Sequence, residues 1–334
     1  MSKVRKSAEF VASKSTNVTV NAEGCRSMAL AIKQRMSHSH YSHSNWSAHT
    51  LNPDMNTPGV VDWIFTIDTL NFSFWSDEPK FEVKYQGNNY TGYWSLVAAI
   101  NRALDENIPI TCPMFWCTDE FNMELIRKIF RSENEASAPL LEERFNVLRE
   151  AGEALKKSGF KSFEDVLRSL NSSNPRSALA VVDWVTSNIG SYDDTALYKN
   201  VKVYIYKRAQ ILVGDIWACF HGTGFGEFED INEITMFADY RVPQILYANN
   251  CIEYSPHFHD KIQKKVMMES GSCEEVEIRE CSIWAVELIV NELNNLGVNI
   301  NAVLADFYLW DTAKEKEKEN TRIIECHRVR SVFY

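Results

Sequence analysis

The chain has 334 residues, of which 45% are hydrophobic and 12% aromatic, so it can bury a sizeable core in one large or two ordinary domains. Its formal net charge of −10 argues against a nucleic-acid-binding protein, which normally carries a basic face, although a local basic patch is compatible with this charge. The acidity weakly favours a cationic ligand. No apolar run is long enough to span a membrane, and residues 1–15 lack the apolar stretch of a secretory signal.

Short helices are predicted at residues 7–12 and 25–35, with a strand-like piece at residues 17–20 between them. Residues 60–75 are unusually rich in aromatic and β-branched side chains, and we expect a buried strand-like or irregular segment there. Four polar residues inside this segment need hydrogen-bond partners if they are buried: Asp68, Thr69, Asn71 and Ser73.

Histidines are concentrated in the serine-rich segment before this stretch, at His38, His40, His43 and His49. Imidazole is a common metal ligand, but the segment has no carboxylate or cysteine at ligand spacing, so we expect neither a metal nor a cofactor. His49 differs from the others because it lies between Trp46 and residues 51–53, where packed structure can hold it. The eight cysteines form no CxxC pair, which indicates reduced thiols of a cytoplasmic protein.

Residues 81–94 alternate apolar and polar side chains around Gly87, which predicts a β-hairpin. A helix with a clear apolar stripe follows at residues 95–105. Ser162 with Asp165 resembles a capping box at the start of a helix. From residue 116 onward helices dominate, and we expect them at residues 118–130, 140–158, 162–170 and 175–186.

A short strand at residues 201–206 is predicted to lead into an apolar helix at residues 207–220. The glycines of residues 221–226 come next. A phosphate-binding glycine loop follows a strand and opens a helix, so a helix C-cap and a turn are the better interpretation of these glycines.

Residues 234–246 are mostly apolar and are interpreted as the end of one buried helix and the start of another. Pro243 suits the first turn of a helix, so Asp239 should lie near a helix start, where free N–H groups favour an anion. Asp239 is either only a helix cap or a carboxylate held in an apolar wall and directed at a ligand. Helix, glycine turn, helix and then an aspartate is also the order in which helix-hairpin-helix base-excision enzymes present their catalytic carboxylate.

Two further helices are expected at residues 274–296 and 299–312, and residues 323–334 are strand-like. Asp306 and Asp311 lie on the second helix. Five residues correspond to about 500° of rotation, so these side chains point about 140° apart on a regular helix. Both can line one pocket only if the helix ends or distorts between them, or if the pocket wraps around it.

Several stretches together carry a resemblance to a known family: residues 68–75, 91–96, 101–105, 108–110, 206–212, 235–244, 275–279 and 308–311. With them the chain resembles, from about residue 7 to residue 334, the eukaryotic queuosine salvage proteins, which are queuosine 5′-monophosphate N-glycosylases/hydrolases. The resemblance implies a mainly α fold with small β elements, related to helix-hairpin-helix DNA glycosylases. We expect a single domain, residues 1–334, in which an N-terminal part with the β-hairpin (about 1–115) packs on a helical part (about 116–334).

The resemblance also implies hydrolysis of queuosine 5′-monophosphate into queuine, a modified 7-deazaguanine, and ribose 5-phosphate. The free queuine would be passed to a tRNA-guanine transglycosylase, without direct binding of nucleic acid or membrane. It implies Asp239 as the catalytic carboxylate. The substrate-binding residues that it implies are His49, Phe237, Asp239, Asp306, Phe307 and Asp311. Phe307 stands where relatives have tyrosine, which keeps the aromatic face and loses a hydroxyl.

The residue types suit this chemistry. Breaking an N-glycosidic bond builds positive charge on the sugar, which a fixed carboxylate stabilises. Lys207 and Arg208 are candidates for the 5′-phosphate, and Arg241 is a candidate ion-pair partner of Asp239. Two other functions stay open: a glycosylase that flips a base out of a nucleic-acid polymer, which needs a basic groove, and a non-catalytic carrier of queuosine or queuine.

Overall fold

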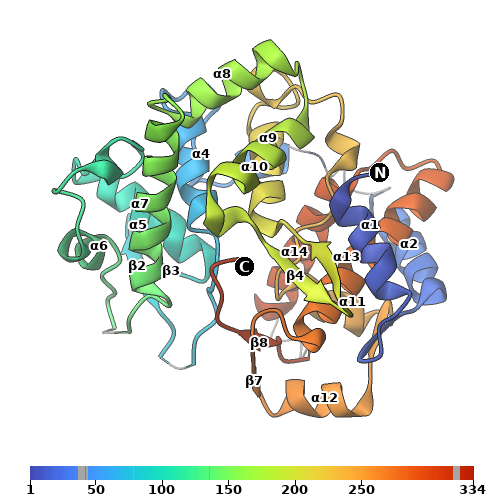
Figure 1. The fold of residues 1–334 in the computed structure, drawn as a ribbon. Coiled ribbons are helices and arrows are strands. Elements are labelled where there is room, and N and C mark those ends of the chain that lie inside the picture. Colours follow the sequence, from blue (N-terminus) through green and yellow to red (C-terminus); the bar gives the residue numbers. More distant parts are fainter. Residues whose placement is uncertain (37–41, 43, 78, 135, 319–323) are drawn as a thin grey trace.

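The computed structural model describes residues 1–36, 42, 44–77, 79–134, 136–318 and 324–334 (Figure 1). This described part is mainly helical with small two-stranded sheets, which confirms the expected mainly α fold class. The helices are α1 (Lys3–Ala12), α2 (Ala22–Met36), α3 (Ser44–Ser47), α4 (Val60–Thr69), α5 (Tyr93–Asp105), α6 (Met123–Ile129), α7 (Leu141–Lys157), α8 (Phe163–Ser173), α9 (Ala178–Asn188), α10 (Lys207–Cys219), α11 (Val242–Ala248), α12 (Pro256–Gln263), α13 (Cys273–Asn295) and α14 (Ala302–Lys318).

Each sheet is a pair of short strands. Three pairs are antiparallel: β1 (Val18–Val20) with β6 (Ile252–Tyr254), β2 (Glu82–Tyr85) with β3 (Asn88–Thr91), and β4 (Thr195–Tyr198) with β5 (Val201–Tyr204). The fourth pair is parallel and joins β7 (Met267–Met268) to β8 (Arg328–Val329). The β1–β6 and β7–β8 pairs connect segments that are far apart in the sequence. The first pair fixes the N-terminal part of the chain against the segment after α11, and the second fixes the C-terminal segment against the one after α12.

Helix α13 lies at the centre of one half of the molecule, where α1, α2, α11 and α14 pack against it (Figure 1). It is buried along nearly its whole length, and several of its charged side chains are paired with groups from other segments. Glu277 accepts hydrogen bonds from the N–H groups of Thr16 and Asn17 at 3.0 and 2.6 Å, and Arg279 donates to Asp194 at 2.7 Å. These bonds tie the N-terminal loop and the segment before α10 to one rigid helix.

Several local predictions are confirmed. The hairpin β2–β3 turns at Gln86 and Gly87, both with positive φ, as a type I′ turn requires. Ser162 and Asp165 form a reciprocal capping box at the start of α8. The glycines after α10 make a helix end and a turn, in which Gly222 has φ of 70° and its N–H donates to the Trp217 carbonyl at 2.9 Å.

The prediction for residues 60–75 is wrong for the first part of this segment, which is the helix α4, whereas residues 70–75 are irregular as expected. Every residue of α4 except Asp62 is buried, so no polar face revealed a helical period. A helix satisfies its own backbone groups, which lets aromatic and β-branched residues be buried on all sides. Asp62 is half-buried, and its Oδ1 accepts the Phe163 N–H at 2.7 Å at the start of α8.

Residues 234–241 also differ from the prediction, because no α-helix ends there. Side chains replace the helical hydrogen bonds in this irregular loop. The Gln210 Oε1 accepts the Thr235 N–H at 2.9 Å, and the Arg279 Nε donates to the Ala238 carbonyl at 3.1 Å. The expected helix start is confirmed, since α11 begins at Val242, three residues after Asp239.

Other boundaries are corrected more simply. Helix α6 is shorter than residues 118–130, and α8 continues to Ser173, beyond the end predicted at residue 170. Of the strand-like residues 323–334, residue 323 lies outside the described part, and only Arg328–Val329 pair in a sheet. Within the described residues, no helix combines the length and the apolar character needed to cross a bilayer.

Candidate active site

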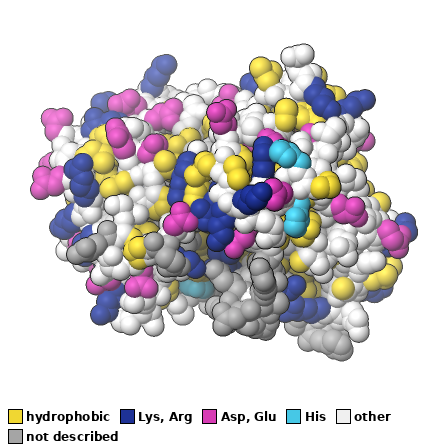
Figure 2. Space-filling model, turned by 90° about the horizontal axis from the view of Figure 1, so that it is seen from below, with side chains coloured by type: hydrophobic (Ala, Val, Ile, Leu, Met, Phe, Trp, Pro, Cys, Tyr) yellow, Lys and Arg dark blue, Asp and Glu magenta, His cyan; other side chains and the backbone are white. Residues whose placement is uncertain are grey.

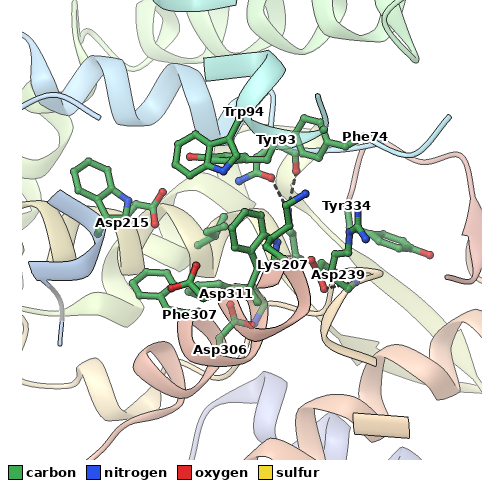
Figure 3. A pocket seen from close by; sticks show the side chains of 18 of the residues that line it. Phe74, Tyr93, Trp94, Lys207, Asp215, Asp239, Asp306, Phe307, Asp311 and Tyr334 are labelled. Atoms are coloured by element: carbon green, nitrogen blue, oxygen red, sulfur yellow. Dashed lines mark hydrogen bonds between the residues drawn. The ribbon is translucent and has the colours of Figure 1, made fainter. Parts of the chain in front are cut away.

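One cavity brings together most of the residues that the sequence singles out (Figure 3). Its walls come from segments spread over the whole chain: the loop after α3, the loop after α4, the first turn of α5, helix α10, the loop before α11, and α14. Among the residues that line it are Trp46, His49, Asn71, Phe74, Tyr93, Trp94, Lys207, Asp215, Phe237, Asp239, Tyr240, Arg241, Asp306, Phe307, Trp310, Asp311, Lys314 and Tyr334.

Asp239 is half-buried in the loop that leads into α11. Its Oδ1 accepts the backbone N–H groups of Arg241 and Val242 at 2.8 and 2.9 Å, which fixes the carboxylate relative to the main chain. Burial raises the pKa of Asp239, while the Val242 N–H and the nearby Lys207 ammonium act in the opposite direction. Asp239 therefore both binds the start of α11 and lines the cavity, so the two interpretations of this residue are compatible.

Asp306 and Asp311 both line the cavity although α14 runs unbroken through them. The cavity therefore wraps around a wide face of the helix, one of the possibilities left open by their spacing. The Asp306 Oδ1 accepts the Phe237 N–H at 2.9 Å, so α14 positions the loop that carries Asp239. Burial raises the pKa of Asp306 well above its usual range, and the neighbouring Asp239 carboxylate raises it further.

Aromatic side chains form much of the remaining wall. The rings of Phe237 and Phe307 lie 6.0 Å apart at an angle of 57°. Across the cavity, His49 stacks on Trp94 with ring centroids 3.3 Å apart, and its Nδ1 accepts the Leu51 N–H at 3.3 Å. The stack holds His49 in place, as expected from its position between Trp46 and residues 51–53. These flat apolar faces suit a planar heterocyclic ring.

Lys207, at the start of α10, extends into the middle of the cavity in Figure 3. Its Nζ donates to the backbone oxygen and the Oδ1 of Asn71 at 2.8 and 2.9 Å. Burial lowers its pKa to about 8, while the carboxylates of Asp239 and Asp68 act to raise it. Lys207 thus supplies a fixed positive charge beside Asp239, and its hydrogen bonds point to Asn71.

Arg208 does not line the cavity, which removes the basis for the phosphate-binding role expected of it. Its side chain is 1% exposed and turns away into the core. The guanidinium donates to the carbonyls of Thr69 and Ser191 and lies over the ring of Tyr192. Arg208 therefore joins α4 to the segment after α9 and has a structural role. Lys207 and Arg208 are adjacent on a helix, so their side chains point in different directions.

Asp215 is a cavity residue that the sequence analysis missed. It lies two turns after Lys207 on α10, is 4% exposed, and accepts a hydrogen bond from the Trp46 side chain. Burial and the nearby Asp68 raise its pKa well above the usual range. The available signal was a single carboxylate within the otherwise apolar sequence of residues 211–219. Asp68 lies behind the cavity wall, where burial raises its pKa to about 7.

No group of three or more His, Cys, Asp or Glu side chains within the described ranges could hold a metal ion. His38, His40 and His43 lie outside those ranges. The expectation that neither a metal nor a cofactor is required therefore stays a prediction.

Comparisons with known proteins agree with the sequence resemblance. A family model described as queuosine salvage protein matches residues 51–334. A relative from Schizosaccharomyces pombe is 40% identical over the full length of both chains, and one from Mus musculus is 42% identical over 99% of this chain and 98% of its own. A relative from Sphaerobacter thermophilus is 38% identical over 82% of this chain and 81% of its own. All three are named queuosine 5′-phosphate N-glycosylase/hydrolase. The chain belongs to the queuosine salvage protein family.

Proposed function

We propose that this chain hydrolyses the N-glycosidic bond of queuosine 5′-monophosphate, releasing queuine and ribose 5-phosphate, with Asp239 as the catalytic carboxylate. The observation that carries the proposal is the position of Asp239, which two backbone N–H groups fix in a cavity of aromatic rings and carboxyl groups. Family membership and the printed names of the full-length relatives support the same reaction.

In this reaction, the sugar gains positive charge as the bond to the base breaks. Asp239 next to C1′ stabilises that charge, and it acts either by orienting the attacking water or by a transient covalent bond. The raised pKa of Asp239 makes its ionised form a stronger base than an exposed aspartate. Lys207 keeps Asp239 ionised through its positive charge, because its coupling to Asp239 favours the charged form of both groups.

The base has features that match the other walls. Queuine carries a secondary amine, which is protonated in water, and a cyclopentene diol, so Asp306 and Asp311 are suitable acceptors for the ammonium, the diol or the guanine-like N–H edge. Phe237 and Phe307 offer faces to the ring system, and His49 offers a ring nitrogen. A carboxyl group with a raised pKa, as at Asp306, can also donate a hydrogen bond to the departing base.

The leaving group explains why such a donor is useful. A 7-deazaguanine has a carbon atom where guanine has N7, so protonation at N7 cannot assist its departure. The electron pair of the broken bond must be stabilised through the remaining heteroatoms of the base. Burial raises the pKa of Asp306 and of Asp215 in the cavity wall, so when protonated these carboxyl groups supply hydrogen-bond donors of the required kind.

The direct test is to incubate the purified protein with queuosine 5′-monophosphate and to measure free queuine by mass spectrometry. We expect release by the wild type and a decrease of at least ~10²-fold in Asp239→Asn, the size seen when one group that stabilises charge in the transition state is removed. Asp183→Asn, at an exposed site on α9, is the matched control and should behave as the wild type. Substrate binding without any queuine release by the wild type would contradict the proposal and indicate a carrier.

We further propose that the helical part is related to the helix-hairpin-helix DNA glycosylases. Supporting features are α10, the glycine turn after it, and Asp239 immediately before α11. Between the turn and Asp239, however, there are only the 3-10 turns η3 (Gly224–Gly226) and η4 (Ile231–Glu233) in place of the expected second helix. Superposition of an experimental structure on such a glycosylase would decide the relation, and a different chain path from α10 to α11 would exclude it.

We also propose that the chain acts in the cytoplasm and that its product passes to a tRNA-guanine transglycosylase. The eight cysteines are all free thiols, which suits a reducing compartment. A coupled assay that follows queuine into transfer RNA tests the hand-over. Incorporation should require both enzymes when queuosine 5′-monophosphate is the source, and incorporation without this chain would refute it.

A further inference from the structure

Asp239 and Lys207, two charged groups of the proposed chemistry, belong to different elements. Asp239 lies in the loop before α11, and Lys207 is the first residue of α10. They lie close together in Figure 3, and the charge of each favours the charged form of the other. This effect weakens as the distance between them grows, so it depends on how the loop is held against the start of α10.

A buried arginine on α13 contacts the loop of Asp239. Arg279 is 1% exposed, and it does not line the cavity. Its Nε donates to the carbonyl of Ala238, the residue before Asp239, at 3.1 Å. Its Nη1 and Nη2 donate to the two carboxylate oxygens of Asp194 at 2.9 and 2.7 Å. A pair with two parallel hydrogen bonds fixes the orientation of the two groups as well as their distance.

Asp194 continues this connection to the start of α10. Its Oδ2 accepts the Lys207 N–H at 3.1 Å, and its backbone oxygen accepts the N–H groups of Ile205 and Tyr206 at 3.0 and 3.2 Å. Tyr206, which precedes the helix, provides no side-chain cap. Asp194 therefore caps α10 from a separate segment, and an unbroken chain of hydrogen bonds runs from Ala238 through Arg279 and Asp194 to Lys207.

The surroundings of Arg279 exclude water and complete its hydrogen bonds. Glu275, one turn earlier on α13, accepts from the Arg279 Nη1 at 3.1 Å, and the ring of Tyr334 lies 4.0 Å from the guanidinium. Asp194 and Glu275 are 3% and 1% exposed. Figure 2 shows the contrasting case, lysine and arginine side chains next to carboxylates at the surface, where water weakens such pairs. A buried guanidinium requires all its partners in place, so it permits one geometry.

The charge of Arg279 also acts on Lys207. Burial lowers the pKa of Lys207 to about 8, and the positive charges of Arg208 and Arg279 lower it further, while Asp239 and Asp68 act to raise it. Among the stretches that carry the family resemblance, residues 275–279 contribute nothing to the cavity wall. Through Arg279 they nevertheless contact both sides of the charged pair.

We propose that Arg279 and Asp194 are positioning residues of the hydrolysis, which hold the loop of Asp239 against the start of α10 so that Lys207 stays beside the carboxylate. This inference rests on the proposed function. Neither side chain lines the cavity, so both act through Asp239 and Lys207. The aromatic walls that bind the base do not depend on this network. Its loss should therefore lower kcat more than it raises KM.

The first test measures kcat and KM for queuosine 5′-monophosphate in Arg279→Lys and Asp194→Asn. Lysine keeps the positive charge but lacks the planar fork that reaches Ala238 and Asp194 together. Asparagine leaves Arg279 with Glu275 as a carboxylate partner, so the buried charge stays paired. We expect kcat to fall about 100-fold in each variant with a much smaller change in KM, because a displacement of about 1 Å at a reacting group has an effect of this size.

The pH dependence gives a second readout. In both variants Lys207 acts less strongly on Asp239, so the acid limb of the pH profile of kcat/KM should move to higher pH. Arg241 and Asp306, the other charged side chains that interact with Asp239, are unchanged in these proteins. A loss of activity that reflects only partial unfolding would leave the position of this limb unchanged.

Arg102→Lys is the matched control. Arg102, on α5, is 8% exposed, donates to the carbonyls of Ile129 and Arg131 at 3.1 and 2.8 Å, and does not line the cavity. The control should lower Tm without changing kcat or the acid limb at temperatures where the protein is folded. In Arg279→Ala, free guanidinium ion, at a concentration well below that which unfolds the protein, should raise kcat about tenfold, the effect of regaining one charge-assisted hydrogen bond.

Wild-type kcat and an unmoved acid limb in Arg279→Lys and Asp194→Asn would overturn the inference. So would losses of kcat that follow the fraction of unfolded protein equally in the Arg279 and Arg102 variants. If Arg279→Lys does not fold, Asp194→Asn decides by the same two readouts. Absence of queuine release by the wild type would instead refute the proposed function itself.

Discussion

Gly214 lies in the middle of α10. For the substitution Gly214→Ala, the structure and a general rule predict changes in stability of opposite sign. Alanine normally stabilises a helix by about 1 kcal/mol relative to glycine. At Gly214, however, a Cβ atom would lie 2.6 Å from the Phe237 Cζ and 3.2 Å from the Val303 Cγ1. Carbon atoms that are not bonded pack at about 3.5–4.0 Å, so the Phe237 ring must move by about 1 Å.

Movement of the Phe237 ring lowers the stability of the protein and changes the shape of the cavity. Overpacking of a core position costs about 1–3 kcal/mol, which exceeds the gain in helix propensity, so we expect Gly214→Ala to lower Tm by a few degrees. Because Phe237 lies between Gly214 and the cavity, the ring moves toward the substrate. The Phe237 N–H donates to Asp306, and Phe237 lies two residues before Asp239, so the movement also disturbs the loop that carries Asp239. We expect at least a tenfold loss of kcat/KM.

Thermal unfolding and queuine release measure the two effects, and a double-mutant cycle isolates the contact. In a Phe237→Leu background there is no ring atom at the Cζ position, so Gly214→Ala should cost less than it does in the wild type, with a coupling above ~0.5 kcal/mol. A variant Gly214→Ala with a raised Tm and unchanged kcat/KM would refute the reasoning, since it would behave as an ordinary helix glycine.

Two further predictions concern pH. Lys207→Met removes a cation that lowers the pKa of Asp239, so the acid limb of the pH profile of kcat/KM should move to higher pH. A basic limb near the Lys207 pKa of about 8 should disappear from the same profile. Limbs that are unchanged in the variant would contradict the assigned role of Lys207. Asp68 has its pKa raised to about 7 by burial, so the native state holds this proton more tightly than the unfolded chain, and its contribution to stability falls as pH rises from about 4 to about 7. Asp68→Asn cannot ionise, so its Tm relative to the wild type should increase from pH 5 to pH 8, and an equal difference at both values would refute this.

The family resemblance implied the mainly α fold class, and local signals predicted the elements with an exposed face. The hairpin at Gly87 and the capping box at Ser162 depend on residues close in sequence, so they could be read directly. The helix α4 could not, because its burial on all sides removed the alternation of polar and apolar residues from which a helix is recognised. The irregular loop before Asp239 depends on bonds from Gln210, Arg279 and Asp306, which only the folded chain brings near.

In the candidate site, too, some residues could be predicted from the sequence and others depend on the folded structure. Asp239 was found from its position before Pro243 and from the family resemblance, and the structure places it in the cavity. Arg208 was expected at the phosphate because it is basic and follows Lys207, but the rotation of the helix turns it into the core. Asp215 lies in the cavity because α10 packs against α3 and lines the same cavity as α14, an arrangement that no local pattern specifies.

The cavity is assembled from segments that include His49, Trp94, Lys207, Asp239 and Asp306, so it exists only when nearly the whole chain is folded. A ligand that binds there binds none of the partly unfolded states, and its binding free energy is added to global stability. At a ligand concentration 100 times its Kd the gain is about 2.7 kcal/mol. Thermal shift should therefore detect the nucleotide, queuine or ribose 5-phosphate whether or not any bond is broken, and the Asp239→Asn protein, which we expect to be inactive, becomes a stable reporter of affinity.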